Sequence, residues 1–181
     1  IGVRLVGSEM CIRDSFYGVK KFINFPLDKS HNETKVDKAL SSSILYFCGG
    51  NTFEFLKSLE ISGLHSKIKD AAKNGSILTG QSAGIILLTP TINMASIPSL
   101  DQDENIVRIK KRKSLGILKF EFSPHYWYNK KSDQELKDYS KNTGKTIYAC
   151  PDGSGLVINE EKTEFIGKVF KFKKGKKEAI K

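Results

Sequence analysis

A Gly-x-Ser-x-Gly pattern, Gly80-Gln81-Ser82-Ala83-Gly84, is the feature of this sequence that most restricts its fold. The preceding residues, Ser76 to Thr79, resemble a short strand, and the apolar run Ile85 to Leu88 continues as a helix. Glycines on both sides of a serine permit a sharp turn that lifts the hydroxyl above the edge of a sheet. Without these flanks the pattern would indicate only a small-residue turn with a capping serine. In this context we predict that Ser82 is a nucleophile.

Strand-like and helix-like segments alternate along most of the chain. The run Ile44 to Cys48 is apolar on both faces, which is typical of a strand buried between helical layers, and Phe53, Leu56 and Leu59 follow at helical spacing. Further elements are expected along the rest of the chain: helices at 36–40, 61–72 and 132–141, strands at 115–122 and 146–149, and an antiparallel meander at 156–158, 163–166 and 169–172. This order predicts a three-layer α/β domain with a mainly parallel sheet and a C-terminal antiparallel hairpin.

The first fifteen residues, 1–15, show no period that leads into the elements after them. The stretch Val6 to Ser15 resembles the translation of a sequencing adapter, so we predict that 1–15 is a leader foreign to the natural protein. The remaining residues, 16–181, are long enough to form a single domain with a hydrophobic core.

The formal net charge is +10, which raises the question of a polyanionic partner. The excess is mostly lysine, whereas arginine is the residue that favours bidentate contacts with phosphate and guanine. It is also concentrated in two short runs, 110–113 and 173–177, which are more typical of solvated turns than of binding surfaces. The sequence therefore disfavours a nucleic-acid partner.

Three cysteines, Cys11, Cys48 and Cys150, are widely separated and form no CxxC pair. This spacing predicts neither a disulfide framework nor a zinc site, and it fits a reducing cytoplasm. No apolar run approaches the roughly 20 residues needed to cross a bilayer. We therefore expect a cytoplasmic protein without a metal or a membrane partner.

A nucleophilic serine needs a base, which is usually a histidine within hydrogen-bond reach. Of the three histidines, His31 lies in a polar loop and His65 at the start of a helix, so both are explained as exposed residues. His125 follows the apolar stretch Leu118 to Phe122, at the C-terminal end of a strand, where the sites of parallel sheets gather. We predict that His125 is the base, in preference to a partly buried histidine within an aromatic cluster.

The base needs an acid that orients it, and two regions of the chain offer one. Asp152 stands after the strand at 146–149, at the same edge of the sheet as the serine and the histidine. Asp101, Asp103 and Glu104 lie in the loop between Ser82 and His125. Either group could also consist of ordinary turn and loop charges, so the residues alone leave the acid open.

The oxyanion formed on attack needs two backbone N–H donors. One belongs to the residue after the nucleophile, Ala83. The Gly49-Gly50 loop at the end of the neighbouring strand can supply the other.

These motifs resemble the peptidase E family, whose relatives include cyanophycinase. The resemblance rests on four segments, in chain order: Phe47-Cys48-Gly49-Gly50-Asn51-Thr52-Phe53, Gly80-Gln81-Ser82-Ala83-Gly84, Pro90-Thr91-Ile92 and Ser123-Pro124-His125-Tyr126. It covers the chain from about Phe16 to the end. It implies a flavodoxin-like fold related to class I glutamine amidotransferases, with serine in place of their nucleophilic cysteine and no metal or organic cofactor.

The resemblance also assigns roles. It carries over Ser82 as nucleophile, His125 as base, and Gly50 and Ala83 as oxyanion-hole donors. For the acid, the family has a Pro-Glu-Gly segment, which Pro151-Asp152-Gly153 matches with a shorter side chain.

A second acid of the family does not carry over. After its Pro-Thr-Ile stretch the family has an Asn-Asp pair, where this sequence has Ser96-Ile97. We therefore expect Asp152 to complete the triad, with Asp101 as the second choice. Family members also begin with a strand and a helix, which we expect 16–181 to lack.

The resemblance implies a serine peptidase for short peptides, among them dipeptides with an N-terminal aspartate, and it leaves a homodimer open. Two alternatives remain. An α/β-hydrolase esterase has the same sharp turn at its nucleophile, called the nucleophile elbow. Its catalytic residues follow the chain order Ser, acid, His, however, and its usual His-Gly-Gly oxyanion motif is absent here. A non-catalytic module on the same fold would instead bind an anionic partner through its basic surface.

Overall fold

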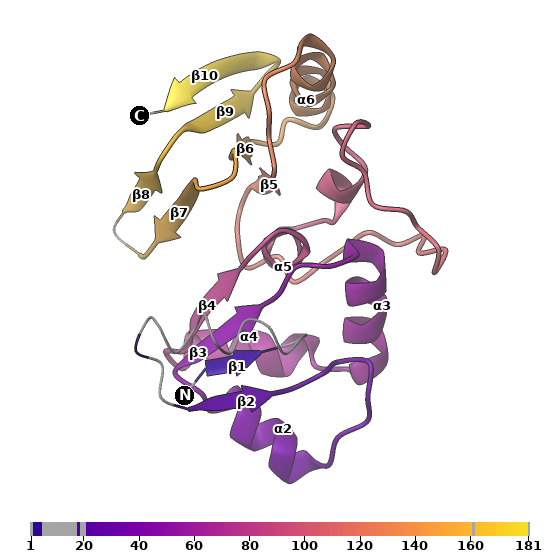
Figure 1. The fold of residues 1–181 in the computed structure, drawn as a ribbon, viewed down its shortest axis with the longest axis vertical. Helices are drawn as coiled ribbons and strands as arrows, with labels where there is room; N and C mark the ends of the chain where they lie inside the picture. The colour runs from indigo at the N-terminus through magenta and orange to yellow at the C-terminus, as the bar shows by residue number, and fades with distance from the viewer. Residues whose placement is uncertain (1, 5–17, 19–20, 161, 181) are drawn as a thin grey trace. The chain divides into compact units, whose positions relative to one another are not determined.

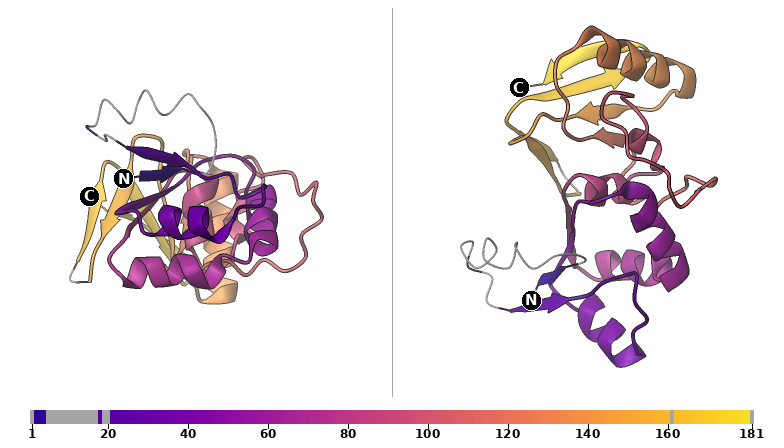
Figure 2. Two further views of the ribbon diagram at one scale, coloured as in Figure 1. Left: turned by 90° about the horizontal axis from the view of Figure 1, so that it is seen from below. Right: turned by 45° about the vertical axis from the view of Figure 1, so that its right-hand side comes forward.

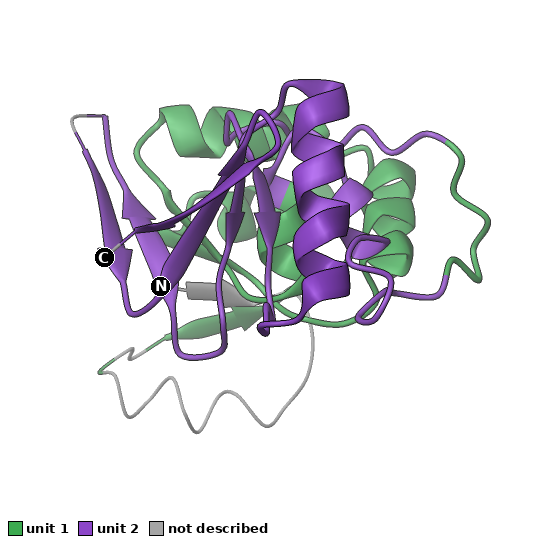
Figure 3. Ribbon diagram, turned by 90° about the horizontal axis from the view of Figure 1, so that it is seen from above, with its two compact units in different colours: residues 1–87, 105–110 green, residues 88–104, 111–181 purple. Residues whose placement is uncertain are grey.

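The computed structural model describes residues 2–4, 18, 21–160 and 162–180. They divide into two compact units, shown in green and purple in Figure 3. Unit 1 comprises residues 1–87 and 105–110, and unit 2 comprises residues 88–104 and 111–181. Within the described part of the chain, no helix has the length and apolar character that crossing a membrane requires.

The described part of unit 1 contains a parallel sheet and helices α2 to α5 (Figure 1). Its elements are, in chain order, β1 (Gly2–Arg4), β2 (Phe22–Asn24), α2 (Glu33–Leu40), β3 (Ile44–Phe47), α3 (Thr52–Ser62), α4 (His65–Lys73), β4 (Ile77–Gly80) and α5 (Ala83–Leu88), whose last residue falls in unit 2. The strand order is β2-β1-β3-β4, and all three pairings are parallel.

Helix α3 shows how the local sequence sets the boundaries of these elements. The Asn51 side chain caps it by accepting hydrogen bonds from the N–H groups of Phe53 at 3.0 Å and Glu54 at 3.1 Å. The apolar stripe predicted from helical spacing is buried, as expected. Gly63 ends the helix in the left-handed conformation at φ 66°. That glycine also explains why the helix predicted at 61–72 begins only at His65.

The N-terminal segment contributes one strand to the sheet. β1 pairs in parallel with β2 on one side and β3 on the other, so residues 2–4 occupy an inner position. The adapter-like stretch, Val6 to Ser15, lies outside the described residues. The assignment of 1–15 to a foreign leader stays a prediction.

Unit 2 contains a mixed sheet, a separate hairpin and one long helix. Its elements are η1 (Asn93–Ala95), β5 (Glu121–Ser123), α6 (Lys130–Thr143), β6 (Ile147–Ala149), β7 (Gly155–Ile158), β8 (Thr163–Ile166), β9 (Val169–Lys173) and β10 (Lys176–Ile180). The sheet order is β10-β9-β6-β5, with β5 and β6 parallel and the other pairs antiparallel. Helix α6 packs against β9 and β10 (Figure 2).

The C-terminal strands differ in part from the predicted meander. β7 and β8 form the expected antiparallel hairpin, but β9 leaves it and pairs with β6 and β10. The α/β class is confirmed. The described strands form a parallel sheet, a mixed sheet and a hairpin, so a single mainly parallel flavodoxin-like sheet stays a prediction.

The strand predicted at 115–122 is much shorter, because its first half bonds to the C-terminal end of α5 and the residue after it. The N–H groups of Gly116, Ile117 and Leu118 donate to carbonyl groups of Thr89 and Leu88 at 2.9 to 3.0 Å. The sheet hydrogen bonds therefore begin only at β5. The apolar character of residues 115–122 did not indicate where the strand begins.

Candidate active site

Ser82 lies between the last residue of β4 and the first residue of α5. Its φ of 52° is in the left-handed region, which non-glycine residues adopt rarely and usually where the surroundings impose it. The neighbouring Gln81 is held on both sides: its N–H donates to the Phe47 carbonyl at 3.0 Å, and its side-chain oxygen accepts from the Tyr46 hydroxyl at 2.7 Å. This is the strained turn that the sequence predicted.

Steric contacts explain why both outer positions of the Gly-x-Ser-x-Gly pattern are glycine. A Cβ on Gly84 would lie 2.0 Å from the Phe47 carbonyl oxygen, and one on Gly80 would lie 2.7 Å from the Ile85 nitrogen. Real Cβ atoms essentially never approach backbone so closely. Glycine at these positions therefore lets α5 cross directly over the end of β3 and fixes the path of the chain through Ser82.

The predicted oxyanion donors belong to the same unit as Ser82. A Cβ on Gly49 would lie 3.4 Å from the Ser82 Cβ and 3.9 Å from its Oγ, so the glycine loop after β3 runs beside the serine side chain. Gly50 has a φ of 134°, a conformation that side chains disfavour, and Ala83 is buried as the first residue of α5.

In unit 2, His125 follows β5 and contacts Asp152. The distance between His125 Nδ1 and Asp152 Oδ1 is 2.7 Å, and the two side chains are 41% and 82% exposed. An ion pair this exposed contributes little to folding stability. Its consequence is orientation: with Asp152 ionised, Nδ1 carries the proton, and Nε2 is left in the form that a general base needs.

Backbone hydrogen bonds place these two residues together. The Cys150 N–H donates to the Ser123 carbonyl, and the Cys150 carbonyl accepts from the Tyr126 N–H, both at 3.0 Å. His125 lies between Ser123 and Tyr126, the two residues held by these bonds, and has a φ of 52°. Asp152 follows two residues after Cys150. The Cys150 thiol itself is buried, which raises its pKa to about 12, so it is a poor nucleophile.

Of the other candidate acids, Asp101 has the clearest link to His125. Partial burial raises the pKa of the Asp101 carboxyl, the nearby His125 lowers it, and the carboxylates of Asp103 and Asp152 raise it further. The Asp103 N–H donates to the Ala95 carbonyl at 2.7 Å. Glu104 is exposed at the end of this segment. The carboxylate in hydrogen-bond contact with Nδ1 is that of Asp152.

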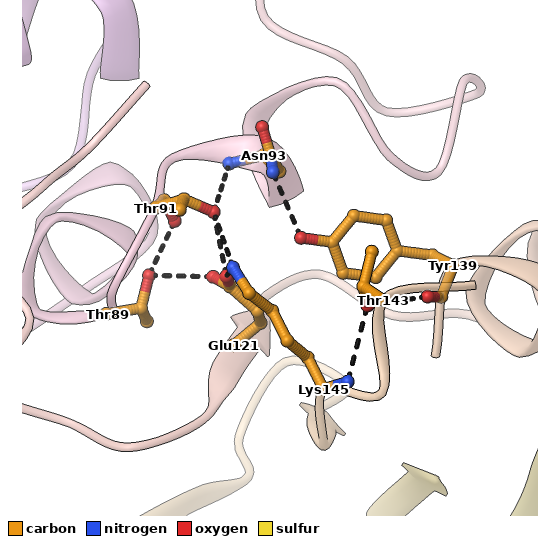
Figure 4. A network of polar contacts seen from close by, with 7 residues as sticks. All are labelled: Thr89, Thr91, Asn93, Glu121, Tyr139, Thr143 and Lys145. Atoms are coloured by element: carbon orange, nitrogen blue, oxygen red, sulfur yellow. Dashed lines mark hydrogen bonds and ion pairs between the residues drawn. The ribbon is translucent and has the colours of Figure 1, made fainter. Parts of the chain in front are cut away.

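A buried polar network at the start of β5 was not predicted (Figure 4). The Glu121 side chain is fully buried, forms an ion pair with Lys145 at 2.5 Å, and accepts hydrogen bonds from the hydroxyl groups of Thr91 at 2.7 Å and Thr89 at 3.1 Å. Burial lowers the pKa of Lys145, but the hydrogen bond and charge of Glu121 outweigh this and raise it. The signal that could have revealed this network is a lone glutamate between Phe120 and Phe122, since a buried carboxylate needs partners.

The remaining histidines have local roles. The His31 ring stacks on Phe25 with centroids 4.1 Å apart, and its Nε2 lies 2.6 Å from the Pro26 carbonyl oxygen. His65 begins α4, where burial and the charge of Lys69 lower its pKa.

A serine at positive φ, flanked by glycines between a strand and a helix, defines an α/β protein with a nucleophile elbow. The chain belongs to peptidase family S51, whose model matches residues 17–166. An uncharacterized peptidase of Listeria monocytogenes is 30% identical over 122 residues, which cover 67% of this chain and 58% of that protein. Peptidase E of Salmonella arizonae is 35% identical over 85 residues, covering 47% of this chain and 34% of that protein.

The fold is similar to that of solved structures. A Listeria monocytogenes EGD-e protein assigned to peptidase E matches with a TM-score of 0.71 at 18% identity, covering 91% of this chain and 84% of that one. A peptidase from an acI-B1 Actinobacterium matches with a TM-score of 0.67 at 16% identity, covering 99% and 79%. In sequence, the chain spans less than three fifths of the first curated relatives that it matches.

Proposed function

We propose that this chain is a serine peptidase for short peptides, with Ser82 as nucleophile, His125 as general base and Asp152 as the acid that orients it. The observation that carries the proposal is the 2.7 Å contact between His125 Nδ1 and Asp152 in a member of a peptidase family. The strained conformation of Ser82 supports it, because strain of this kind gathers at functional sites.

The proposal requires the two four-stranded sheets to join edge to edge. β4 and β5 are each the last strand in the order of their sheet. If they lie side by side, the strands follow the order β2-β1-β3-β4-β5-β6-β9-β10 in one three-layer, flavodoxin-like sheet. The carboxyl ends of β4 and β5, which precede Ser82 and His125, would then meet at one edge, where the sites of such sheets gather.

In the proposed reaction, His125 Nε2 accepts the hydroxyl proton as Ser82 Oγ attacks the peptide carbonyl carbon. The N–H groups of Gly50 and Ala83 donate to the oxyanion. His125 then returns the proton to the leaving amine, so the C–N bond breaks and an acyl-enzyme remains. Water, deprotonated by His125, releases the acid product and restores the serine.

For substrates we propose short peptides, including dipeptides with an N-terminal aspartate, acted on in the cytoplasm. Relatives named peptidase E support a peptide substrate. Recognition of an aspartate side chain needs a basic group, for which Arg108 and the lysines at 110–113 are candidates by sequence position alone.

The esterase alternative is less well supported. An α/β-hydrolase takes its acid from the chain between the serine and the histidine. Here the acid in contact with His125 is Asp152, which gives the order Ser, His, acid. Faster cleavage of simple acyl esters than of peptides would favour the esterase.

The test is hydrolysis of Asp-containing dipeptides by this chain and by its Ser82→Ala variant. The wild-type chain is expected to release amino acids, and the variant to lose activity by a factor on the order of 10⁶. Ser76→Ala, a change of a serine on the same unit at the entry to β4, is the matched control and should keep activity. Equal turnover by the wild type and Ser82→Ala would reject the assignment.

A further inference from the structure

Lys177 on β10 is the centre of a polar cluster within unit 2. Its Nζ lies 2.8 Å and 3.0 Å from the two carboxylate oxygens of Asp133, and it donates to the Tyr126 hydroxyl at 2.6 Å. The Tyr126 hydroxyl in turn donates to Asp133. The Lys177 and Asp133 side chains are only 19% and 23% exposed, so this is a largely enclosed ion pair rather than a solvated one.

Aromatic rings enclose the same ammonium group. Lys177 Nζ lies 4.8 Å from the ring centroid of Phe170, 5.2 Å from those of Tyr126 and Tyr128, and 5.8 Å from that of Phe172. Such positions are attractive for a cation, and more so where water is excluded. The strand register explains the arrangement, since Lys177 is the cross-strand partner of Phe172.

The pKa shifts of Asp133 and Tyr126 agree with these contacts. Burial opposes ionisation of Asp133, but hydrogen bonds from Lys177 and Tyr126 outweigh it and lower the pKa of this carboxyl. Burial, together with the bond to Asp133, raises the pKa of Tyr126, so the phenol stays protonated. One carboxylate, one ammonium group and one neutral hydroxyl therefore share three mutually satisfied contacts.

The cluster is connected to the proposed base through Tyr126, the next residue after His125. The Tyr126 side chain is 2% exposed, and its N–H donates to the Cys150 carbonyl at 3.0 Å. His125 has a left-handed φ of 52°, which its own preferences do not favour. A rigidly anchored neighbour is what holds a residue in such a conformation.

We propose that Lys177, acting through Asp133 and Tyr126, is a positioning residue that keeps His125 in contact with Asp152. The proposal rests on the proposed function only in that the position of His125 matters for hydrolysis. It assigns a role in the site to the C-terminal strand, 52 residues after the histidine.

The kinetic test compares Lys177→Met with Lys176→Met, which alters the exposed neighbouring lysine of β10. Lys177→Met should lower kcat by about tenfold or more with KM within about twofold, because a small displacement of a reacting group slows the chemical step. Lys176→Met should leave both constants unchanged, and Lys177→Arg should recover part of kcat. An unchanged kcat in Lys177→Met overturns the proposal.

A second readout does not depend on activity. We expect a downfield Nδ1–H proton resonance from His125 in the NMR spectrum, which Asp152→Ala abolishes. Lys177→Met should broaden or remove it, whereas Lys176→Met keeps it. If Lys177→Met does not fold, Tyr126→Phe, which removes one hydroxyl, should weaken the same resonance. A resonance insensitive to both changes overturns the proposal, whereas a sensitive resonance in a chain without hydrolytic activity would reject only the proposed function.

Discussion

The elbow around Ser82 and the segment around His125 are held in place by different kinds of interaction. Around Ser82 the constraints are steric and lie in the backbone: positions 80 and 84 admit no side chain, and α5 lies against the end of β3 with almost no room. Around His125, backbone hydrogen bonds of Cys150 are joined by polar side chains, in the network of Glu121 before it and the cluster of Lys177 after it.

The elbow and the His125 segment should therefore respond differently to mutation and to pH. Backbone contacts do not titrate, so the elbow should be insensitive to pH but intolerant of any added carbon. The paired charges of the His125 segment should tolerate small changes of side-chain volume. They should not tolerate the loss of one partner, because the other charge is then left unpaired and poorly solvated. Each of the following predictions tests one side of the comparison.

The largest effect is expected at the acid of the histidine segment. Asp152→Ala should lower kcat/KM by about 10³-fold, because His125 loses the carboxylate that orients its ring. Asp101→Ala, which removes a nearby carboxylate without the Nδ1 contact, should cost less than about tenfold in the same dipeptide assay. If Asp101→Ala were the more damaging change, the acid would be misassigned.

Loss of one buried charge should come next. Lys145→Met leaves the fully buried Glu121 without its cation, and we expect the free energy of unfolding to fall by about 4 kcal/mol in urea denaturation. Lys119→Met, at an exposed lysine two residues before Glu121, should change it by less than about 0.5 kcal/mol. Equal small changes of the unfolding free energy in both variants would mean that the Glu121–Lys145 pair does not stabilise the His125 segment.

Overpacking the elbow should be nearly as costly. Gly84→Ala places a methyl group against the Phe47 carbonyl and should lower the free energy of unfolding by about 3 kcal/mol. Gly155→Ala is the control, because a Cβ there meets nothing within 4 Å and φ is not positive, so less than about 0.5 kcal/mol is expected. Full stability of Gly84→Ala would refute the steric account.

Some of these features could be predicted from the sequence, and others could not. The elbow and the apolar stripe of α3 were predictable because each depends on residues a few positions apart. The pairing of β9 with β6 and the contact of Lys177 with Asp133 join residues more than 20 positions apart, so no local pattern encodes them. The family resemblance favoured Asp152 over Asp101, but the contact of His125 with Asp152 joins residues 27 positions apart, so no local pattern encodes it.

The smallest predicted effect is a pH dependence. The pKa of Asp133 is lowered in the folded chain, so below its usual value of 3.8 the unfolded chain binds more protons than the folded one. Stability from this pair should be present above pH 3.8 and lost as pH falls through the lowered pKa. Urea denaturation from pH 5 to pH 2 should show a shallower fall for Asp133→Asn than for the wild type. Parallel curves would contradict a stabilising role for this carboxylate.

The central claim is that the His125 imidazole activates the Ser82 oxygen as a nucleophile. Intact-mass analysis after treatment with a serine-directed phosphonate tests it most directly, because the reagent reacts only with a serine that a nearby base activates. We predict one adduct, located on Ser82, in the wild-type chain, and none at the same time point in His125→Ala. Absence of labelling in the wild type, or equal labelling in both, would contradict the account.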